Sequence, residues 1–468
     1  MRFCLLSLIG ALTAGCTSIQ MVPAAQAEMW VTTADESQKL AQQPLLATAG
    51  PVVGDEAIRI DTTKHFQRVH GFGAAMTDAS AQLLSRLPEQ QRKAIMAELF
   101  SRQGGGLGLS FTRLTVGASD FSPTHYSYDD PPGNAPDREL RYFSIEPARK
   151  YVLPRVREAL AINPDLKVMI SPWSAPAWMK TSGSLIQGQL KPEYYPAFAY
   201  YLARTVEGFR TEGVPVSMLT IQNEPDFEPD SYPGMRVNSP DRAIIIGRFV
   251  GPIFARRGLK IQILDYDHNW DNPEMPWTVL SDPMARKYVS GVAWHCYEGD
   301  VPAQSQVHDA FPEKDSWFTE CSGGEWSPKF AEVLDWMTDK LIIGGANNWS
   351  RGTLLWNLAL DPQHGPHKGG CGDCRGVITI DPATGAITRN VEYYVLGHAS
   401  RYVLPGAWRV ATQTNVEGVA AASFLNVDGS RVAIVHRKSG DAPIALAIDG
   451  QRFVVPLAKG AVATLRWR

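Results

Sequence analysis

Two glutamates of this chain each stand at the end of an apolar run. Glu224 lies just before the end of the stretch Leu219–Pro225, and Glu320 lies in the stretch Ser316–Gly323. Pro225 has no N–H to donate and ends the first run as a strand. Two carboxyl groups, one acting as acid and base and the other as nucleophile or base, are what hydrolysis of a glycosidic bond requires. An Asn-Glu-Pro segment is by itself equally typical of a capped surface loop, so the fold has to decide between the two interpretations.

Eight apolar runs, each ending in glycine, polar or aromatic residues, are the elements that would position these side chains. They are His70–Ala75, Leu109–Val116, Lys167–Trp173, Val216–Asn223, Lys260–Asp265, Val289–His295, Trp317–Glu320 and Thr353–Asn357. Most are separated by stretches with helical spacing, such as 79–100. Strands alternating with helices in this way predict an α/β fold, a (β/α)8 TIM barrel. Because all strands of such a barrel end on one face, Glu224 and Glu320 are expected to lie together.

The ends of these runs gather further residues suited to a sugar. The set is Arg113, Asp120, Trp173, Asn223, His295, Tyr297 and Trp356, together with the two glutamates. Arginine, aspartate and asparagine bind hydroxyls, and tryptophan can carry the face of a pyranose. Plainer interpretations stay open, with Arg113 and Asp120 as a structural ion pair, His295 as a buried core histidine and Tyr297 as packing. Cys296 and Cys321, beside the site, are expected to be buried thiols.

The first residues have the pattern of an export signal. Met1-Arg2 and the short apolar run 3–12 form a charged segment and a hydrophobic segment. Two processing sites compete. The segment 12–16 resembles a bacterial lipoprotein box, which would lipidate Cys16, and Ala25–Ala27 is an A-x-A cleavage site. We favour the lipoprotein, and therefore expect a periplasmic or outer-membrane lipoprotein of a bacterium, alternatively a secreted protein, with a lipid anchor as its only link to a membrane.

The remaining chain divides into a tether, the barrel and a second domain. Residues 1–27 are assigned to the export segment, 28–68 to a tether (about 28–50) followed by a strand near Ile58, 69–389 to the barrel and 390–468 to an antiparallel β-sandwich. Segments that alternate apolar and polar residues flank the turns Asp428-Gly429 and Asp449-Gly450, which predicts two β-hairpins. The strand near Ile58 is expected to join this sandwich. Cys371 and Cys374 lie in a glycine-rich loop, where a local disulfide is favoured over a redox or metal motif.

Composition and missing motifs exclude several other classes of function. A formal net charge of −3 offers no basic surface for nucleic acid. The sequence has no Gly-x-Ser-x-Gly, His-Glu-x-x-His or Gly-x-Gly-x-x-Gly motif. An α/β-type esterase, a zinc protease and a dinucleotide enzyme therefore lack their usual support, and neither a metal nor an organic cofactor is expected.

Beyond these patterns, the chain resembles glycoside hydrolase family 30, in particular its glucosylceramidase-like branch. The matching segments are His70–Ser80, Ser171–Lys180, Thr220–Pro225, Trp294–Tyr297, Thr319–Ser322 and Trp356–Leu360. The resemblance implies the barrel with a fused β-sandwich, Glu224 as acid/base and Glu320 as nucleophile of a retaining enzyme. It also implies that the seven residues of the sugar set line the subsite for the glycone, the sugar whose bond is cleaved.

The substrate is expected to be a β-glucoside. Asp120 and Trp356 match glucose-binding positions, which favours glucose over xylose, since xylose lacks the C6 hydroxymethyl group. The leaving group stays open among a ceramide, an oligosaccharide and a β-1,6-glucan, because variable loops would select it. An endo-β-1,6-glucanase, a β-xylosidase or xylanase of the same family, and a non-catalytic carbohydrate-binding protein are the alternatives.

Overall fold

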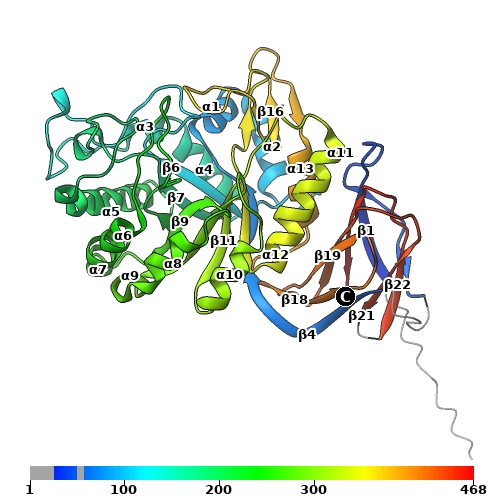
Figure 1. The fold of residues 1–468 in the computed structure, drawn as a ribbon. Helices are drawn as coiled ribbons and strands as arrows, with labels where there is room; N and C mark the ends of the chain where they lie inside the picture. Colours follow the sequence, from blue (N-terminus) through cyan, green and yellow to red (C-terminus); the bar gives the residue numbers. More distant parts are fainter. Residues whose placement is uncertain (1–25, 50–56, 449) are drawn as a thin grey trace, which may run out of the picture.

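The computed structural model describes residues 26–49, 57–448 and 450–468. Cys16 and the run 3–12 lie outside these residues, and so does Asp449. Two bodies are visible in Figure 1, a barrel surrounded by helices and a smaller, all-β body beside it. Within the described ranges, no helix combines the length and the apolarity that a membrane crossing requires.

The barrel is closed by eight parallel strands, and they are the eight predicted runs in their predicted order. The strands are β5 (Gly71–Ala74), β6 (Phe111–Val116), β7 (Lys167–Pro172), β8 (Val216–Thr220), β9 (Gln262–Asn269), β10 (Val289–His295), β11 (Asp315–Glu320) and β13 (Ser350–Leu355). Strands buried on both faces carry continuous apolar runs, which is why they could be recognised. At Gly73 a Cβ atom would lie 1.8 Å from the carbonyl oxygen of Phe111, so the glycine allows β5 to approach β6.

Helices surround this barrel. They are α1 (Asp78–Arg86), α2 (Glu89–Phe100), α3 (Glu146–Lys150), α4 (Val152–Ile162), α5 (Tyr195–Thr211), α6 (Ser239–Ile244), α7 (Gly251–Arg256), α8 (Glu274–Ser281), α9 (Pro283–Arg286), α10 (Ala303–Ala310), α11 (Phe330–Met337), α12 (Gly345–Asn347) and α13 (Val391–Ser400). π-helical turns, η4 (Ile245–Val250) and η5 (Thr338–Gly344), join α6 to α7 and α11 to α12. The 3-10 turns are η1 (Pro132–Asn134), η2 (Ala177–Met179) and η3 (Pro192–Tyr194). Thr77 directly precedes α1 and caps it, because its Oγ1 accepts from the Ser80 N–H at 3.2 Å.

Short strands lie near the carboxyl ends of the barrel strands. β12 (Gly323–Gly324) pairs with β15 (Cys374–Arg375), and β14 (Ala359–Leu360), β16 (Ile378–Ile380) and β17 (Ile387–Arg389) form a small sheet. These pairings hold the segment 361–376 over the carboxyl ends of the barrel strands.

The second body uses both ends of the chain. Its sheet has the order β2-β1-β23-β20-β19-β18-β4-β21-β22, with β3 paired to β1. Its strands are β1 (Gln26–Thr32), β2 (Ala41–Gln42), β3 (Leu46–Ala47), β4 (Ile58–Val69), β18 (Ala407–Thr414), β19 (Val419–Leu425), β20 (Arg431–Arg437), β21 (Ile444–Ile448), β22 (Gln451–Val455) and β23 (Val462–Trp467). The sheet folds over its own hydrophobic core, so it forms the predicted β-sandwich, and the strand near Ile58 does join it. Both predicted hairpins form, β19 with β20 and β21 with β22.

Two segments differ from their predicted roles. Residues 28–50, expected to be a tether, begin inside β1, which pairs with β23 from Glu28↔Arg466 to Thr32↔Val462. Ala27, Met29 and Val31 alternate as buried residues, and this short period-two pattern was hidden beside the export signal. Residues 391–400, expected in the sandwich, form α13.

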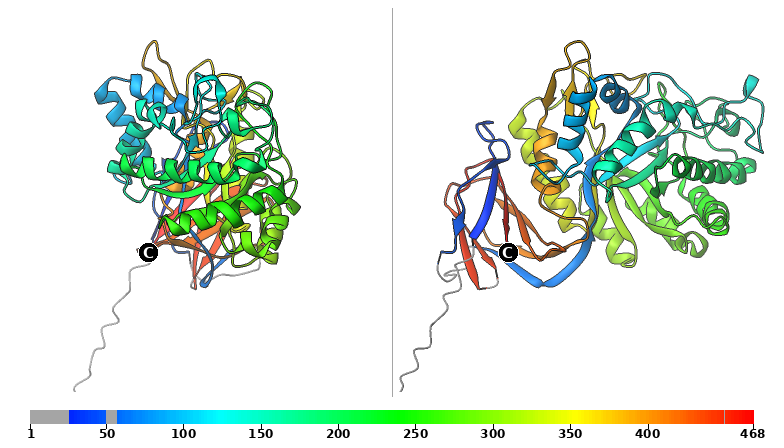
Figure 2. Two further views of the ribbon diagram at one scale, coloured as in Figure 1. Left: turned by 90° about the vertical axis from the view of Figure 1, so that its left-hand side faces the viewer. Right: turned by 180° about the vertical axis from the view of Figure 1, so that it is seen from behind.

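The two bodies are joined covalently and by packing. β4 runs from the sandwich directly to β5 of the barrel, as the rear view in Figure 2 shows. On the other side α13 contacts β23, and His398 hydrogen-bonds Thr464 Oγ1 and Thr32 Oγ1, each at 2.9 Å. The sandwich thus packs on the barrel away from the ends of the strands that carry the glutamates.

Candidate active site

The carboxyl ends of β8 and β11 bring Glu224 and Glu320 together. A carboxylate oxygen of each, with a ring nitrogen of His295, lies within 4.8 Å of the others. Glu320 ends β11 and is 5% exposed. Glu224 lies beyond the end of β8 in the left-handed region, with φ +45°, and its N–H donates to the carbonyl oxygen of Asp267 at 3.0 Å. A non-glycine residue with this backbone is strained, a feature that clusters at functional sites.

Arg113 connects the polar groups between these strands. It is fully buried on β6, and its Nη1 donates to Glu320 Oε2. Its Nη2 donates to Asn223 Oδ1 at 2.7 Å and to Asp267 Oδ2 at 2.6 Å. The ion pair with Asp120, considered from the sequence, is replaced by these two carboxylate partners.

Asp267 is the main polar residue that the sequence interpretation missed. The fifth run was ended at Asp265, whereas β9 continues to Asn269. Asp267 is fully buried and accepts hydrogen bonds from Thr220, Thr319 and Ser171 at 2.6, 2.8 and 2.9 Å. Burial would raise the pKa of its carboxyl, but Arg113 outweighs burial and holds the pKa far below the usual range. The polar segment 267–269, directly after an apolar run, was the available signal.

His295 lies between two carboxyl groups. Its Nδ1 is 3.2 Å from Glu224 Oε1, and its Nε2 is 3.0 Å from Asp267 Oδ1. Burial opposes a charge on the ring, but the carboxylates of Glu320, Asp267 and Glu224 outweigh it and raise the pKa of His295 to about 9. The residue is buried as a core histidine would be, yet both ring nitrogens are protonated at neutral pH and the ring is positively charged.

The two glutamates have opposite pKa shifts. Burial raises the pKa of the Glu320 carboxyl above its usual range, against the lowering effects of His295 and Arg113. Burial also acts to raise the pKa of Glu224, but the hydrogen bond and charge of His295 outweigh it, and the pKa is lowered.

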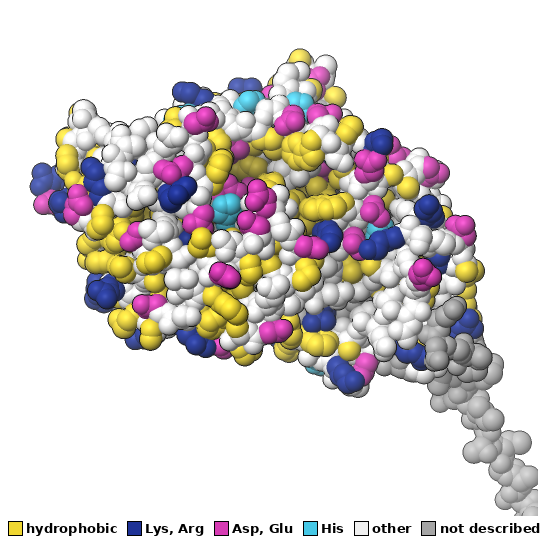
Figure 3. All heavy atoms as spheres, viewed as in Figure 1, with side chains coloured by type: hydrophobic (Ala, Val, Ile, Leu, Met, Phe, Trp, Pro, Cys, Tyr) yellow, Lys and Arg dark blue, Asp and Glu magenta, His cyan; other side chains and the backbone are white. Residues whose placement is uncertain are grey.

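A pocket of about 590 Å³ lies above these groups. It is lined by Asp120, Trp173, Asn223, Glu224, Ser231, Tyr232, Tyr297, Glu320, Trp326, Trp356, Gly370, Cys371 and Cys374. Five of the seven residues of the predicted sugar set therefore line the pocket. The other two, Arg113 and His295, do not line it but contact Glu320 and Glu224. Figure 3 shows a hollow on this side of the molecule, with hydrophobic side chains inside it and acidic and histidine side chains along its edge.

The tryptophan with a face free for a sugar is not one of the two that the sequence suggested. Trp173 and Trp356 stack on each other with ring centroids 4.8 Å apart, and Arg113 lies 4.7 Å from the Trp173 ring. Trp173 is only 2% exposed, so these neighbours already cover its faces. Trp326, which sequence reasoning did not single out, is 54% exposed and offers a free face for stacking. It lies in the loop after β12, where no periodic pattern points to it.

Asp120 and the Cys371–Cys374 loop form one wall of the pocket. Burial, with the charges of Glu320 and Glu224, raises the pKa of Asp120 to about 8, so its carboxyl is protonated at neutral pH. A Cβ at Gly370 would lie 2.4 Å from Asp120 Cβ, so the glycine lets the loop reach this wall. Cys371 and Cys374, expected to pair, form a disulfide with their Cα atoms 5.6 Å apart.

Cys296 and Cys321 form a second disulfide, so the expectation of buried thiols is wrong. His295 pairs with Glu320 in the register of β10 and β11, which sets the next residue of each strand side by side. The bond thus joins the residue before Tyr297 to the residue after Glu320. The Tyr297 hydroxyl donates to Glu320 Oε1 at 2.9 Å, so this tyrosine is more than packing.

Comparison with known proteins agrees with this geometry. Residues 69–403 match the glycosyl hydrolase family 30 TIM-barrel domain, and residues 406–465 match the family 30 beta sandwich domain. The chain belongs to glycosyl hydrolase family 30. The resemblance drawn from the sequence motifs is thereby confirmed, and this family 30 protein is a glycoside hydrolase.

Relatives of this family 30 enzyme include glucanases and glucosylceramidases. It is 33% identical over 411 residues to the endo-1,6-beta-D-glucanase neg1 of Aspergillus fumigatus, covering 82% of each chain. It is 29% identical over 442 residues to the lysosomal acid glucosylceramidase of Mus musculus, covering 88% of this chain and 83% of that one. A solved endo-beta1,6-glucanase superposes with a TM-score of 0.87 at 29% identity, covering 94% of this chain and 99% of the other.

Proposed function

We propose that this family 30 enzyme hydrolyses β-glucosides with retention of configuration, with Glu320 as nucleophile and Glu224 as acid/base. The observation that carries the proposal is the separation of the two carboxyl groups, whose nearest oxygens lie within 4.8 Å. Retaining glycosidases hold their carboxyl groups about 5–5.5 Å apart, whereas inverting enzymes keep about 6.5–9.5 Å to admit a water molecule. The short separation supports double displacement.

In the first step, Glu320 attacks the anomeric carbon while Glu224 gives a proton to the departing glycosidic oxygen. This forms a glucosyl ester on Glu320. In the second step, Glu224 takes a proton from water, which displaces the ester and leaves a β-configured product. Arg113 and Tyr297 donate to opposite oxygens of Glu320, so they orient the carboxylate and stabilise its charge before attack and after release.

Hydrogen bonding supports this assignment of roles. The pKa directions of the two carboxyls by themselves would suit the exchanged roles. Glu320, however, accepts from two donors that favour its anion, while Glu224 faces His295, whose pKa is about 9. The Glu224–His295 pair therefore holds a proton at neutral pH, and Glu224 Oε1, 3.2 Å from Nδ1, is the atom that would pass it on.

A β-1,6-linked glucan is the substrate with most support. Relatives named as endo-1,6-β-glucanases are 33% and 29% identical to this chain over most of its length. The pocket holds Asp120 and Trp356, as expected for glucose. A glucosylceramide is the second candidate, favoured by an apolar pocket of about 530 Å³ next to the sugar pocket.

Three enzymes test the roles, the wild type, Glu320→Gln and Glu224→Ala. With 2,4-dinitrophenyl β-glucoside, whose leaving group needs no proton, Glu224→Ala should form the glucosyl-enzyme and then stall. Azide should rescue it and give β-glucosyl azide. Glu320→Gln should be inactive on every substrate. An exchange of these two patterns would reverse the roles, and an α-anomer as the first product seen by NMR would refute retention. A wild type that binds sugar but hydrolyses no glucoside would support the carbohydrate-binding alternative.

Export with lipidation at Cys16 is part of the proposal. Cleavage after Ala27 would remove the two residues of β1, Gln26 and Ala27, that pair with Ala47 and Leu46 of β3. Processing at Cys16 keeps β1 whole. Mass spectrometry of the mature N-terminus from a bacterial membrane fraction should find a diacylglyceryl cysteine, and a chain in the soluble fraction that begins at Glu28 would replace lipidation with secretion.

A further inference from the structure

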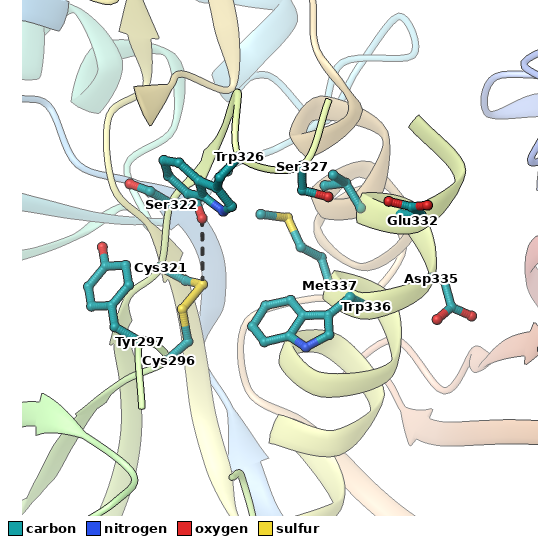
Figure 4. A pocket seen from close by; sticks show the side chains of 12 residues that line it. Cys296, Tyr297, Cys321, Ser322, Trp326, Ser327, Glu332, Asp335, Trp336 and Met337 are labelled. Atoms are coloured by element: carbon teal, nitrogen blue, oxygen red, sulfur yellow. Dashed lines mark hydrogen bonds between the residues drawn. A yellow bond between two sulfur atoms is a disulfide. The ribbon is translucent and has the colours of Figure 1, made fainter. Parts of the chain in front are cut away.

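Two more pockets adjoin the sugar pocket, and Tyr297 borders all three. The first, here called the apolar pocket, is lined by Trp326, Val333, Trp336, Met337 and the Cys296–Cys321 disulfide. In Figure 4, Tyr297 and the disulfide form one side of it, and Trp336 and Met337 of α11 form the other.

The second, here called the acidic cleft, has a volume of about 430 Å³. Besides Glu224 and Tyr297, its lining includes Phe227, His268, Asn269, Asp271 and Glu298. Glu224 lines both the acidic cleft and the sugar pocket, but it does not line the apolar pocket.

This arrangement decides where a leaving group goes. The acid must contact the glycosidic oxygen, so the group bonded to that oxygen begins at Glu224. Glu224 opens on one side to the sugar pocket and on the other to the acidic cleft. The apolar pocket instead borders Cys321 and Ser322, which directly follow Glu320. A leaving group could enter the apolar pocket only by turning past Tyr297.

We infer that the acidic cleft is the leaving-group subsite and that it takes a hydroxyl-rich sugar. The inference rests on the proposed function for the position of the acid. It decides between the sugar and the ceramide as leaving group, and it names the residues that select the leaving group.

The cleft offers fixed donors. Asn269 is 7% exposed, and its Oδ1 accepts from the Tyr297 N–H at 3.1 Å, which orients the amide. Its Nδ2 has no hydrogen-bond partner among the described residues, although it belongs to a side chain that is almost fully buried. His268 Nδ1 accepts from the Asn269 N–H at 2.8 Å, and burial lowers the pKa of His268, so the neutral ring presents Nε2–H as a second donor.

The cleft also offers acceptors and an aromatic face. Asp271 and Glu298 have no ion-pair partner in the part of the chain that the structure describes, so their oxygens are free for hydroxyls. Phe227 is 47% exposed, which leaves its ring available for stacking on a sugar ring. Donors, acceptors and an aromatic face together match a sugar, in which each hydroxyl both donates and accepts. An alkyl chain would displace the water bound to these groups and could not offer them hydrogen bonds in return, which costs free energy.

The test compares a substrate that fills the cleft with one that does not. Gentiobiose, a β-1,6-linked glucose disaccharide, places a glucose on the leaving-group side, whereas β-glucosyl fluoride releases only fluoride. Phe227→Ala should lower kcat/KM for gentiobiose about tenfold more than for the fluoride, a loss expected for one aromatic contact. Trp336→Ala, which removes an exposed aromatic from the apolar pocket, is the matched control and should not change the ratio. Thermal melting confirms that both variants fold.

A ratio that changes in Trp336→Ala and not in Phe227→Ala would overturn the inference and place the leaving group in the apolar pocket. Unchanged ratios in both variants would overturn it as well. A second measurement does not depend on turnover. In a Glu320→Gln background, calorimetry should give weaker gentiobiose binding for Phe227→Ala and unchanged binding for Trp336→Ala. If the wild type hydrolyses neither substrate, the proposed function fails, while this binding comparison still decides the inference.

Discussion

Arg113 and Asp267 form an ion pair in which both side chains are fully buried, with Nη2 2.6 Å from Oδ2. Burying two charges costs several kcal/mol per ion, so such a pair is a poor means of stabilising a fold. Here each partner also contacts a catalytic candidate, Arg113 contacting Glu320 and Asp267 contacting His295. We interpret the pair as a positioning device for the two sides of the site.

Replacing Asp267 with asparagine should therefore reduce both stability and turnover. Leaving Arg113 partly unpaired should cost about 3–5 kcal/mol of unfolding free energy. Asp265→Asn is the matched control, because Asp265 lies on the same strand and accepts from the buried Arg242 at 2.9 Å, away from the glutamates. Denaturant unfolding should show a comparable loss in both variants. Turnover per folded molecule should fall only in Asp267→Asn, and an equal fall in both would contradict the positioning role.

The raised pKa of His295 predicts that stability falls with increasing pH. The folded protein holds this proton up to about pH 9, whereas an unfolded histidine loses it near pH 6.5, the ordinary pKa of its ring. The stabilisation is complete below pH 6.5 and disappears as pH rises to 9, a loss of about 3 kcal/mol. Urea unfolding across this range should show a steeper fall of stability in the wild type than in His295→Asn, in which the raised pKa of Asp120 still contributes a fall up to about pH 8. A flat wild-type curve would contradict the charged state of His295.

The protonated carboxyl of Asp120 should make glucose binding depend on pH. Its pKa is about 8, so it can donate to a sugar hydroxyl below that pH and repels the other carboxylates above it. Inhibition by glucose should weaken above pH 8 in the wild type. Asp120→Asn, which keeps a donor at every pH, should remove this dependence, and Asp120→Ala should weaken inhibition about tenfold. The same pH dependence in Asp120→Asn as in the wild type would assign it to another group.

The two disulfides should have unequal effects. Cys296–Cys321 closes a loop with a sequence separation of 25, and Cys371–Cys374 one with a separation of 3. Removing the first should cost about 3 kcal/mol by loss of chain-entropy stabilisation, and removing the second much less. Because the first also joins the backbone beside Tyr297 and Glu320, the double serine variant should lose kcat with a smaller change in KM. The Cys371/Cys374 double serine variant is the control, and equal kcat losses in both would refute the positioning effect.

The residues that could be predicted from sequence share one physical origin. Parallel strands buried on both faces require continuous apolar runs, and such runs made the barrel and the positions of Glu224 and Glu320 readable. Asp267 escaped because it lies inside a strand but beyond its apolar part. The Cys296–Cys321 bond depended on the register of two neighbouring strands, which no local pattern contains. Trp326 lies in a loop that tertiary contacts alone position.

The sheet that joins both ends of the chain also sets an order of folding. β23 lies between β1 and β20, so the pairing of Glu28 with Arg466 spans almost the whole sequence. Contacts between residues this distant form late, since they must close the longest loop in the chain. During synthesis β1 can pair at once only with the short strands β2 and β3, while its long partner β23 and the partners of β4, β18 and β21, are made near the end of the chain. A chain cut just before β23 would leave the edges of β1 and β20 open to pairing with other chains.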